Sequence, residues 1–509
     1  MYKLEIHLLE GEYWWGGIVN DGIYMPFQEQ SIKRDLAKDQ LTNQTSPFLL
    51  SSKGRYVWSD KPFQYHLYDK CLHIASEFEE IRLSDGHQNL KGAYKDASRR
   101  YFPPANRMPE AMLFTAPQYN GWIEMMYEPS QIKVLEYARG ILNNGFPPGV
   151  LMIDDSWQED YGVWKFSTEK FPNPKEMIDE LHTMGFKVML WICNYISPDC
   201  VTFRMLREKD LLIKDKMGTP VINEWWNGFS AILDSTNPQA VDWIEKQLDR
   251  LMEELGVDGF KFDAGDLDSF HDYYQCKIPS LNVEYCEAWA KLGLKYTMNE
   301  YRACWKMAGQ PLVQRLSDKF HSWSKENGLG SVIPNGLAQG LLGHSFICPD
   351  MIGGGEILSF KKNLNNLDQE LFVRYAQCSA LFPMMQFSAA PWRVLDQIHL
   401  SYCREAALLH NRMGEEIIKI ARESSVTGEP ILRHMAFSFP EAGYDTIIDQ
   451  FMLGDDILVA PVIRKGETSR EIRFPEGTWV GDDSSQVIGP CKLTVQAPLY
   501  RLPWYRRCK

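Results

Sequence analysis

A regular alternation of short apolar runs with amphipathic segments, in the middle of the chain, constrains the fold most. The apolar runs fit β-strands, and the first four are AMLFTAP (111–117), GVLMIDD (149–155), FKVMLWI (186–192) and GVDGFKF (256–262). The segments between them space apolar residues three or four apart, as in Ile244, Leu248, Leu251 and Leu255, which predicts one apolar helix face. Repeated strand-then-helix units predict a parallel sheet.

Three later runs continue this alternation, at 313–318, 345–350 and 383–388. Eight strands with their helices fit into roughly 300 residues, the usual size of a (β/α)8 barrel. A doubly wound open sheet is the competing fold, but no G-x-G-x-x-G motif follows the first run. We therefore predict an α/β fold built on a (β/α)8 TIM barrel.

The two ends of the chain have a different pattern from the middle. The N-terminal part consists of short runs interrupted by polar residues and ends in the proline-rich stretch YFPPANRMP, and short strands with turn signals return near the C-terminus. A chain of 509 residues is also too long for one ordinary core. We predict a β-sandwich-like N-terminal domain at 1–108, the barrel at 109–412 and a C-terminal β-sandwich at 413–509.

Four of the apolar runs end in acidic side chains. The run at 149–155 ends in Asp154 and Asp155, Asp263 follows the run at 256–262, and the later runs end in Asp318 and Asp350. One acid after a strand can simply cap a helix or form a turn, and that alternative stays open for each alone. Because the carboxyl ends of barrel strands meet on one face, where active sites are built, four such ends predict a common site.

Paired carboxylates on that face favour glycoside hydrolysis, in which retaining enzymes hold a nucleophile and an acid about 5 to 5.5 Å apart. Lys261 lies two residues before Asp263 and therefore on the same side of the strand. Its ammonium lowers the pKa of Asp263 and keeps the nucleophile ionised, unless the two form only a structural ion pair. Asp318 fits the acid, and we expect a raised pKa for it against the effect of Arg315.

Composition excludes several other classes of function. The formal net charge of −13 argues against nucleic acid or an anionic membrane as partner. No apolar stretch approaches the roughly 18 residues that span a bilayer, and the N-terminus does not resemble a signal peptide, so we expect a cytoplasmic protein. Eleven cysteines without a C-x-x-C pair, and no His/Cys cluster with ligand spacing, predict reduced thiols, no metal and no other cofactor.

Several longer stretches resemble glycoside hydrolase family 31. KFDAGD at 261–266 is similar to the nucleophile motif of that family, YRACWKMAGQPLVQRLSDKFHSW at 301–323 to its acid/base segment, and PDMIGG at 349–354 to the segment on its seventh strand. LMIDDSW at 151–157 and FPMMQFSAAPWR at 382–393 resemble the α-galactosidase-like subgroup. The resemblance runs from about Trp14 to the C-terminus, and it implies Asp263 as nucleophile, Asp318 as acid/base and Arg302 as a substrate contact.

Two departures from the family pattern bear on the sugar. Most members carry Trp three residues before the acid/base, where this chain has Arg315, and Arg-Asn-His on the eighth strand, where it has Gln386-Phe387-Ser388. Asp154, Asp155, Trp157 and the pair Lys261 and Asp263 also resemble the signature of the α-galactosidase families 27 and 36. There the adjacent aspartates bind O4 and O6 of galactose, and the lysine binds O3 and O4. The resemblance therefore favours galactose over glucose.

Other aromatic and polar residues are weaker candidates for the sugar site. They are Trp191, Trp226, Trp15, Trp392 with Arg393, and Asp350, each of which also has a structural alternative such as core packing or a hydrogen bond. The hypothesis is a retaining exo-α-galactosidase whose partner is a small α-galactoside or oligosaccharide. An α-glucosidase, a transglycosidase and a non-catalytic carbohydrate-binding protein are the alternatives. The sequence leaves open whether the chain forms a homo-oligomer.

Overall fold

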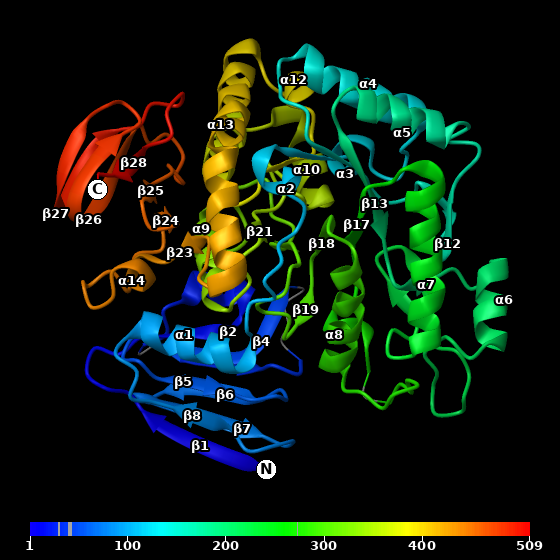
Figure 1. The fold of residues 1–509 in the computed structure, drawn as a ribbon, viewed down its shortest axis with the longest axis horizontal. Coiled ribbons are helices and arrows are strands. Elements are labelled where there is room, and N and C mark those ends of the chain that lie inside the picture. Colours follow the sequence, from blue (N-terminus) through cyan, green and yellow to red (C-terminus); the bar gives the residue numbers. More distant parts are fainter. Residues whose placement is uncertain (29–30, 39–42, 272, 509) are drawn as a thin grey trace.

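Eight short parallel strands form the centre of the structure, a computed structural model that describes residues 1–28, 31–38, 43–271 and 273–508 (Figure 1). In order around the sheet they are β21 (Ile347–Cys348), β20 (Gln314–Arg315), β18 (Asn299–Tyr301), β17 (Gly259–Phe262), β13 (Lys187–Ile192), β10 (Val150–Ile153), β9 (Gln118–Asn120) and β22 (Gln386–Phe387). A parallel bridge between Met351 and Gln386 joins the last strand to the first and closes the ring. The predicted (β/α)8 barrel is confirmed.

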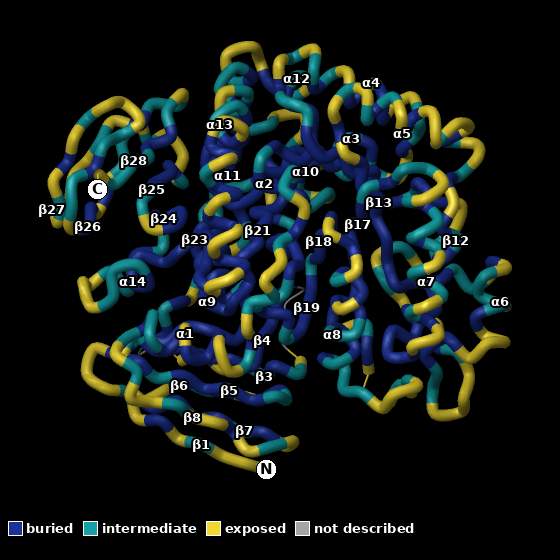
Figure 2. The backbone as a smooth tube through the Cα atoms, viewed as in Figure 1, coloured by how far each residue is buried: buried dark blue, intermediate teal, exposed yellow. Residues whose placement is uncertain are grey.

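Helices that connect the strands cover the outside of the barrel. They are α4 (Gln131–Asn143), α5 (Pro174–Thr183), α7 (Pro238–Arg250), α8 (Asn282–Leu292), α9 (Leu329–Leu341), α10 (Ile357–Asn363), α11 (Gln369–Ala380) and α13 (Gln397–Thr427). On α7 the buried side chains are Ala240, Ile244 and Leu248, which form the predicted apolar face. Figure 2 shows the strands buried and the outer faces of these helices exposed, so the core lies inside the barrel and beneath its helices.

The sequence misassigned two segments of the barrel. Residues 111–117, predicted as a strand, contain the short helix α2 (Met112–Thr115), and the strand β9 begins only at Gln118. Leu113 and Phe114 are buried beside α13, and periodicity cannot separate a short buried helix from a strand. The strand β18 was not predicted because its sequence, Asn-Glu-Tyr, is polar although all three residues are buried.

Two sheets make up the N-terminal β-rich region. The first contains β1 (Tyr2–His7), β7 (Cys71–Ser76), β6 (Gln64–Tyr68) and β3 (Ile32–Asp35), and the second contains β4 (Gln44–Ser51), β5 (Tyr56–Trp58), β8 (Arg82–Ser84) and β2 (Trp14–Ile18). The helix α1 (Leu90–Tyr101) follows them. A strand from the barrel, β19 (Cys304–Trp305), pairs with β4. This pairing joins the region to the barrel at the segment that follows β18.

The C-terminal region is one antiparallel sheet of six strands. They are β23 (Leu432–Arg433), β24 (Phe451–Leu453), β25 (Ile457–Val459), β28 (Trp504–Arg507), β26 (Ser469–Gly481) and β27 (Gln486–Gln496). This β-sheet domain lies apart from the barrel strands, on the far side of α13 (Figure 1). The predicted boundary at 412–413 falls inside α13, and the domain bounds stay a prediction.

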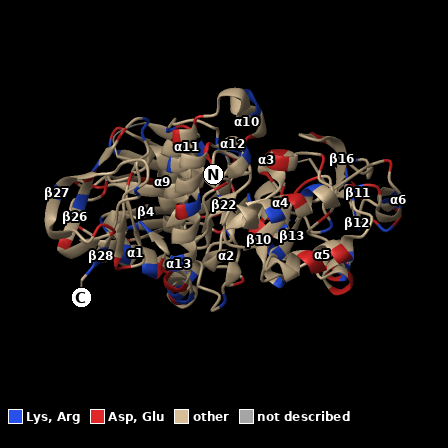
Figure 3. Ribbon diagram, turned by 90° about the horizontal axis from the view of Figure 1, so that it is seen from above, with Lys and Arg blue, Asp and Glu red and all other residues tan. Residues whose placement is uncertain are grey.

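The surface and the thiols show no unusual feature in the described residues. Along the ribbon in Figure 3, the positions of Lys and Arg are interspersed with those of Asp and Glu. Among the described helices, none combines the length and the apolar character that a membrane crossing requires. The cysteine thiols are free, and Cys491 and Cys508 are the exposed ones.

Candidate active site

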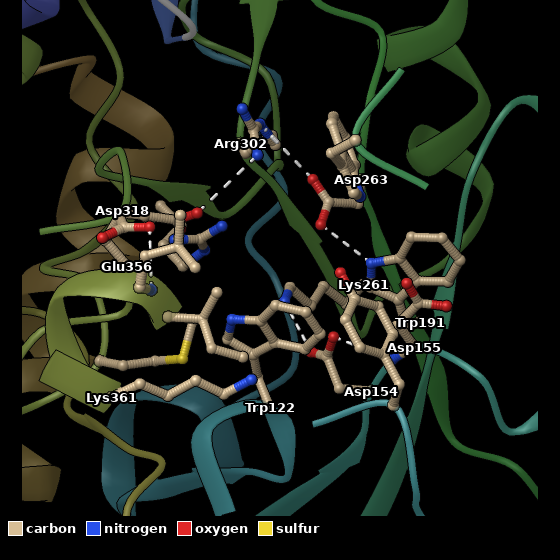
Figure 4. Close-up of a pocket in the computed structure, with 16 residues that line it drawn as sticks. Trp122, Asp154, Asp155, Trp191, Lys261, Asp263, Arg302, Asp318, Glu356 and Lys361 are labelled. Atoms are coloured by element: carbon tan, nitrogen blue, oxygen red, sulfur yellow. Dashed lines mark hydrogen bonds and ion pairs between the residues drawn. The ribbon is translucent and has the colours of Figure 1, made fainter. Parts of the chain in front are cut away.

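A cavity of about 400 Å³ opens at the carboxyl ends of the barrel strands. It is lined by nine of the residues predicted from the sequence, namely Asp154, Asp155, Trp191, Trp226, Lys261, Asp263, Arg302, Arg315 and Asp318. These residues come from β10, β13, β17, β18, β20, the turns after them and the hairpin tip that carries Trp226, and they surround a common space (Figure 4). The strand-end acids therefore converge as expected, with the exception of Asp350.

Asp263 is held at the end of β17 by an indole and by cations. Its Oδ2 accepts a hydrogen bond of 2.9 Å from Nε1 of Trp191, and the Arg302 guanidinium Nε lies 3.5 Å from its Oδ1. Burial alone would raise the pKa of Asp263, but Arg302, Lys261 and Arg315 together lower it to about 2. The next residue, Ala264, has φ of 60°, a left-handed turn that ends the strand at this carboxylate. Asp263 is therefore an ionised, fixed carboxylate at neutral pH.

Lys261 makes its direct ion pair with Asp154 rather than with Asp263. Its Nζ lies 2.6 Å from Oδ2 of Asp154, and both side chains are buried. Lys261 still lowers the pKa of Asp263 through its charge, as expected from the sequence. Burial and the charge of Asp154 raise the pKa of the neighbouring Asp155 to about 7. One wall of the cavity thus combines an ion pair with a carboxyl group that titrates near neutral pH.

A hairpin between β13 and α7 forms hydrogen bonds to the carboxyl group of Asp155. Its strands are β15 (Ile222–Trp225) and β16 (Gly228–Ile232), and its tip carries Trp226 and Asn227. Asn227 Nδ2 donates to Asp155 Oδ2 at 2.6 Å and to the Tyr161 hydroxyl at 2.9 Å, and that hydroxyl donates to Asp155 Oδ1 at 3.1 Å. The ring of Trp226 lies 5.1 Å from the Arg302 guanidinium, a cation–π contact.

Arg302 lies between the two candidate catalytic acids. Its Nη1 is 3.9 Å from Oδ2 of Asp318, and its Nε is 3.5 Å from Oδ1 of Asp263 (Figure 4). A third acid, Asp266, lies 3.4 Å from the same Nε, and burial raises its pKa to about 6. One guanidinium therefore spans the gap from Asp263 to Asp318.

The expectation of a raised pKa for Asp318 is wrong for this structure. Burial would raise the pKa, but Arg315 and Arg302 lower it below its usual value. Arg315 Nη1 donates to Asp318 Oδ1 at 2.5 Å and to Asp350 Oδ1 at 2.7 Å. Burial raises the pKa of Asp350 to about 6. Without a bound substrate, Asp318 is thus a carboxylate.

The two departures from the family pattern meet at one buried acid. Glu300, on β18, lies 3.3 Å from the Arg315 Nε and accepts a hydrogen bond of 2.7 Å from Gln386 Nε2. Burial raises the pKa of Glu300, and Arg315 opposes that shift. Both unusual residues therefore belong to one polar network inside the barrel, directly beneath the cavity.

Five of the predicted site residues do not line the cavity, and one of them, Arg393, forms an ion pair of 2.7 Å with Glu124 instead. Trp157 is buried behind it and donates from Nε1 to the backbone oxygen of Trp191 at 2.8 Å. Asp350 lies beneath it, bound to Arg315 and to the backbone N–H of Lys319. Trp392 packs on Tyr137 instead, and Trp15 on His434, so neither reaches the sugar position expected for it. The sequence shows only that these residues are aromatic or acidic, not which way they point.

Several residues that complete the site were not predicted. The additional lining residues are Trp122, Tyr127, Met351, Glu356, Ile357, Leu358 and Lys361. Gln44 of the N-terminal region donates from Nε2 to the backbone oxygens of Arg302 and Arg315 and so holds both arginine segments. The position of residues 356–361, directly after the segment PDMIGG, could have indicated this wall. Nothing in the sequence around Gln44 or Asn227 could have done so.

Comparison with known proteins agrees with the fold and shows the family. Residues 118–413 match the model described as the glycosyl hydrolases family 31 TIM-barrel domain, and residues 428–508 match the family 31 C-terminal domain. The chain belongs to glycoside hydrolase family 31. In the described part of the chain, no group of three or more His, Cys, Asp or Glu side chains is arranged to hold a metal ion.

The curated relatives of this chain include two proteins that are named as glycosidases. The chain is 32% identical to the myogenesis-regulating glycosidase of Mus musculus over 403 residues, which cover 77% of this chain and 56% of the relative. It is 25% identical to alpha-glucosidase 2 of Bacillus thermoamyloliquefaciens over 446 residues, 80% of this chain and 54% of that protein. The chain thus spans about half the length of these curated relatives.

A solved structure shows the same fold. The GH31 dextranase of Flavobacterium johnsoniae, complexed with glucose, superimposes with a TM-score of 0.85 at 19% identity. The match covers 99% of this chain and 66% of the dextranase.

Proposed function

We propose that this protein is a retaining, exo-acting α-glycosidase that releases terminal α-linked galactose by double displacement. The observation that carries the proposal is the pair Asp263 and Asp318, which line one cavity and contact the same Arg302 guanidinium. A gap bridged by one guanidinium is compatible with direct displacement at a sugar carbon by one acid while the other protonates the leaving oxygen.

Asp263 is suited to the nucleophilic step. Its carboxylate is ionised because Arg302, Lys261 and Arg315 lower its pKa to about 2, and the Trp191 indole fixes Oδ2. The other oxygen, Oδ1, accepts a hydrogen bond of 2.9 Å from the backbone N–H of Ala264 and keeps a further lone pair. With this lone pair it attacks the anomeric carbon and forms a β-linked glycosyl-enzyme as the bond to the leaving group breaks. Water then attacks the same carbon and releases the α-anomer, which makes the overall reaction retaining.

Asp318 must gain a proton before it can act as the acid. About 32% of its side chain is exposed, so a bound leaving group would cover it and raise its pKa by desolvation. Asp318 then protonates the glycosidic oxygen. In the second step Asp318, again a carboxylate, takes the proton of the attacking water.

The preference for galactose rests on the wall opposite Asp318. Asp154 and Asp155 follow β10, and Lys261 connects Asp154 to the nucleophile strand. Galactose differs from glucose in the axial O4, and an acceptor aimed at that hydroxyl is left unpaired by the other epimer. An unpaired buried polar group costs about 1–3 kcal/mol, enough to discriminate the two sugars by roughly 5- to 150-fold.

A panel of 4-nitrophenyl α-glycosides tests the proposal. We expect kcat/KM to be highest for the α-galactoside among galactose, glucose and xylose, and the first product to be α-galactose by NMR. Initial formation of the β-anomer would contradict the retaining mechanism. Higher kcat/KM for the glucoside would favour the second candidate, an α-glucosidase, which is supported by the relative named alpha-glucosidase 2. Saturable sugar binding without turnover would indicate a non-catalytic protein.

A further inference from the structure

The order of the barrel strands separates the cavity into two halves. Asp318 follows β20, and β21 is the neighbouring strand, after which come Met351 and α10. Asp154, Asp155 and Trp191 lie on β10 and β13 or directly after them, four and three strands from β20 around the ring. Because the acid must reach the glycosidic oxygen, the leaving group lies on the side of Asp318 and α10 (Figure 4).

The wall on that side is apolar. Met351, Ile357 and Leu358 line it, and Leu358 leaves 71% of its surface exposed at the mouth. In the described part of the chain, no Ser, Thr, Asn, Gln or His side chain lines the cavity. Glu356 and Lys361 are the polar side chains on this wall, so a second sugar ring would leave most of its hydroxyl groups against Met351, Ile357 and Leu358, which is unfavourable, whereas a hydrocarbon surface would be buried favourably.

The two charged side chains on this wall differ in their partners. Glu356 caps α10, and its two oxygens accept hydrogen bonds from the backbone N–H groups of Leu358 and Ser359 at 3.1 and 2.6 Å. Each oxygen keeps a further acceptor site, so Glu356 is held by the first turn of α10 but is not saturated. Lys361 also lines the cavity, and none of the hydrogen bonds or ion pairs found in the described residues involves its ammonium. The wall thus presents the ammonium of Lys361 and the helix-capping side chain of Glu356 beside an apolar surface.

We propose that the leaving group of the natural substrate is an apolar aglycone that carries a negative charge, rather than a second neutral sugar. The apolar part contacts Met351, Ile357 and Leu358, and the anionic group pairs with Lys361. This inference rests on the proposed glycosidase function, and it narrows the substrate class on the leaving-group side only. It does not depend on whether the released sugar is galactose or glucose.

A series of alkyl α-galactosides tests the inference, because their leaving groups need the same acid catalysis. The series is methyl, octyl and 7-carboxyheptyl α-galactoside, compared with a disaccharide in which galactose is α-linked to glucose. All are measured below the concentration at which the octyl compound forms micelles. We expect kcat/KM for octyl to exceed that for methyl and for the disaccharide by about tenfold, as burial of two or more methylene groups predicts. The carboxylated compound should gain a further severalfold at low ionic strength.

Substitutions on α10 test whether this wall causes the expected differences in kcat/KM between the alkyl α-galactosides. Leu358→Asn should reduce the ratio of octyl to methyl kcat/KM toward one, and Lys361→Gln should remove the advantage of the carboxylated over the neutral chain. Leu364→Asn and Lys362→Gln are matched controls, since neither residue lines the cavity, and both ratios should be unchanged in them.

The outcomes separate this inference from the proposed function. Equal or higher kcat/KM for the disaccharide than for the octyl compound would overturn the apolar aglycone. An unchanged carboxylate advantage in Lys361→Gln would overturn the role of Lys361. If no α-galactoside, including the nitrophenyl compound, is hydrolysed, the proposed release of galactose itself fails. The same series made from α-glucosides then tests the aglycone independently.

Discussion

The nucleophile side and the acid side of the cavity use arginine in opposite ways. On β17, Asp263 has a side chain only 10% exposed, and cations with an indole N–H keep it ionised and fixed. After β20, the Asp318 side chain is 32% exposed, and its contact with Arg315 lowers its pKa. Asp318 therefore lacks the proton that a general acid must donate. Under the proposed mechanism, Asp263 is therefore ready as nucleophile before substrate binds, whereas Asp318 becomes an acid only when a leaving group covers it.

Because of this difference, a neighbouring cation by itself does not show whether an acid is suited to its catalytic role. A cation beside a nucleophile supports its chemistry, because ionisation is what the step requires. A cation beside a general acid opposes it, unless burial by the substrate reverses the balance. Substitutions on the two sides should therefore differ in size and in their dependence on the leaving group.

Substitution of Asp263 should have the largest effect. Asp263→Asn removes the attacking carboxylate while keeping the shape, so we expect kcat to fall by about 10⁴-fold or more, as for other nucleophile variants. Steady-state hydrolysis of 4-nitrophenyl α-galactoside measures it. Asp268→Asn, at an exposed position shortly after the same strand, is the control and should keep normal activity. Retained activity in Asp263→Asn would disprove its role.

Substitution of Asp318 should depend on the leaving group. In Asp318→Ala we expect kcat/KM for an alkyl α-galactoside to fall by about 10²- to 10⁴-fold, the usual contribution of a general acid. The loss should be much smaller for a dinitrophenyl galactoside, whose leaving group departs without a proton. An equal loss for both substrates would show that Asp318 acts in some way other than proton transfer.

Substitution of Arg315 should affect stability more than any exposed residue would. Arg315→Met leaves Asp350 and Glu300 buried without their cation, and loss of one partner of a buried pair costs about 3–5 kcal/mol. A buried carboxyl with a raised pKa destabilises the folded state once it ionises. The loss should therefore grow as pH rises through the pKa of Asp350, about 6 with Arg315 present and higher without it.

Urea unfolding of the wild type and of Arg315→Met across this pH range measures the effect. Arg464→Met, at an exposed ion pair near the C-terminal sheet, is the control and should change the free energy of unfolding little. A pH-independent loss would mean that Asp350 and Glu300 stay ionised in both proteins.

Substitution of Asn227 should have the smallest effect, and it should show in the pH dependence. The amide of Asn227 donates to Asp155 and lowers its pKa, which burial raises to about 7. Asn227→Ala should raise the pKa of Asp155 further. The pH below which kcat/KM falls should therefore move upward, and kcat/KM at neutral pH should decrease by several fold. Asn223→Ala, on the same hairpin but bonded to Ser269, should not move this limb.

The barrel could be predicted because its signal is repetitive. The strands β10, β13 and β17 are apolar, and β10 and β17 are followed by acids, so both their type and their common face follow from local pattern. The polar strand β18 and the helix α2 could not be predicted, because burial there depends on partners distant in the sequence. The same limit applies to Trp15 and Trp392, whose indoles pack away from the cavity.

The amino-acid sequence by itself determined the barrel, the family and the positions of the two candidate acids, Asp263 and Asp318. Each of these follows from the spacing of residues or from a contiguous motif. Only the tertiary structure decided the protonation of Asp318, the partner of Lys261 and the apolar wall on α10. These depend on distances of a few ångströms between separate strands and loops. Electrostatic and hydrogen-bond energies change steeply over such distances, and spacing along a chain does not specify them.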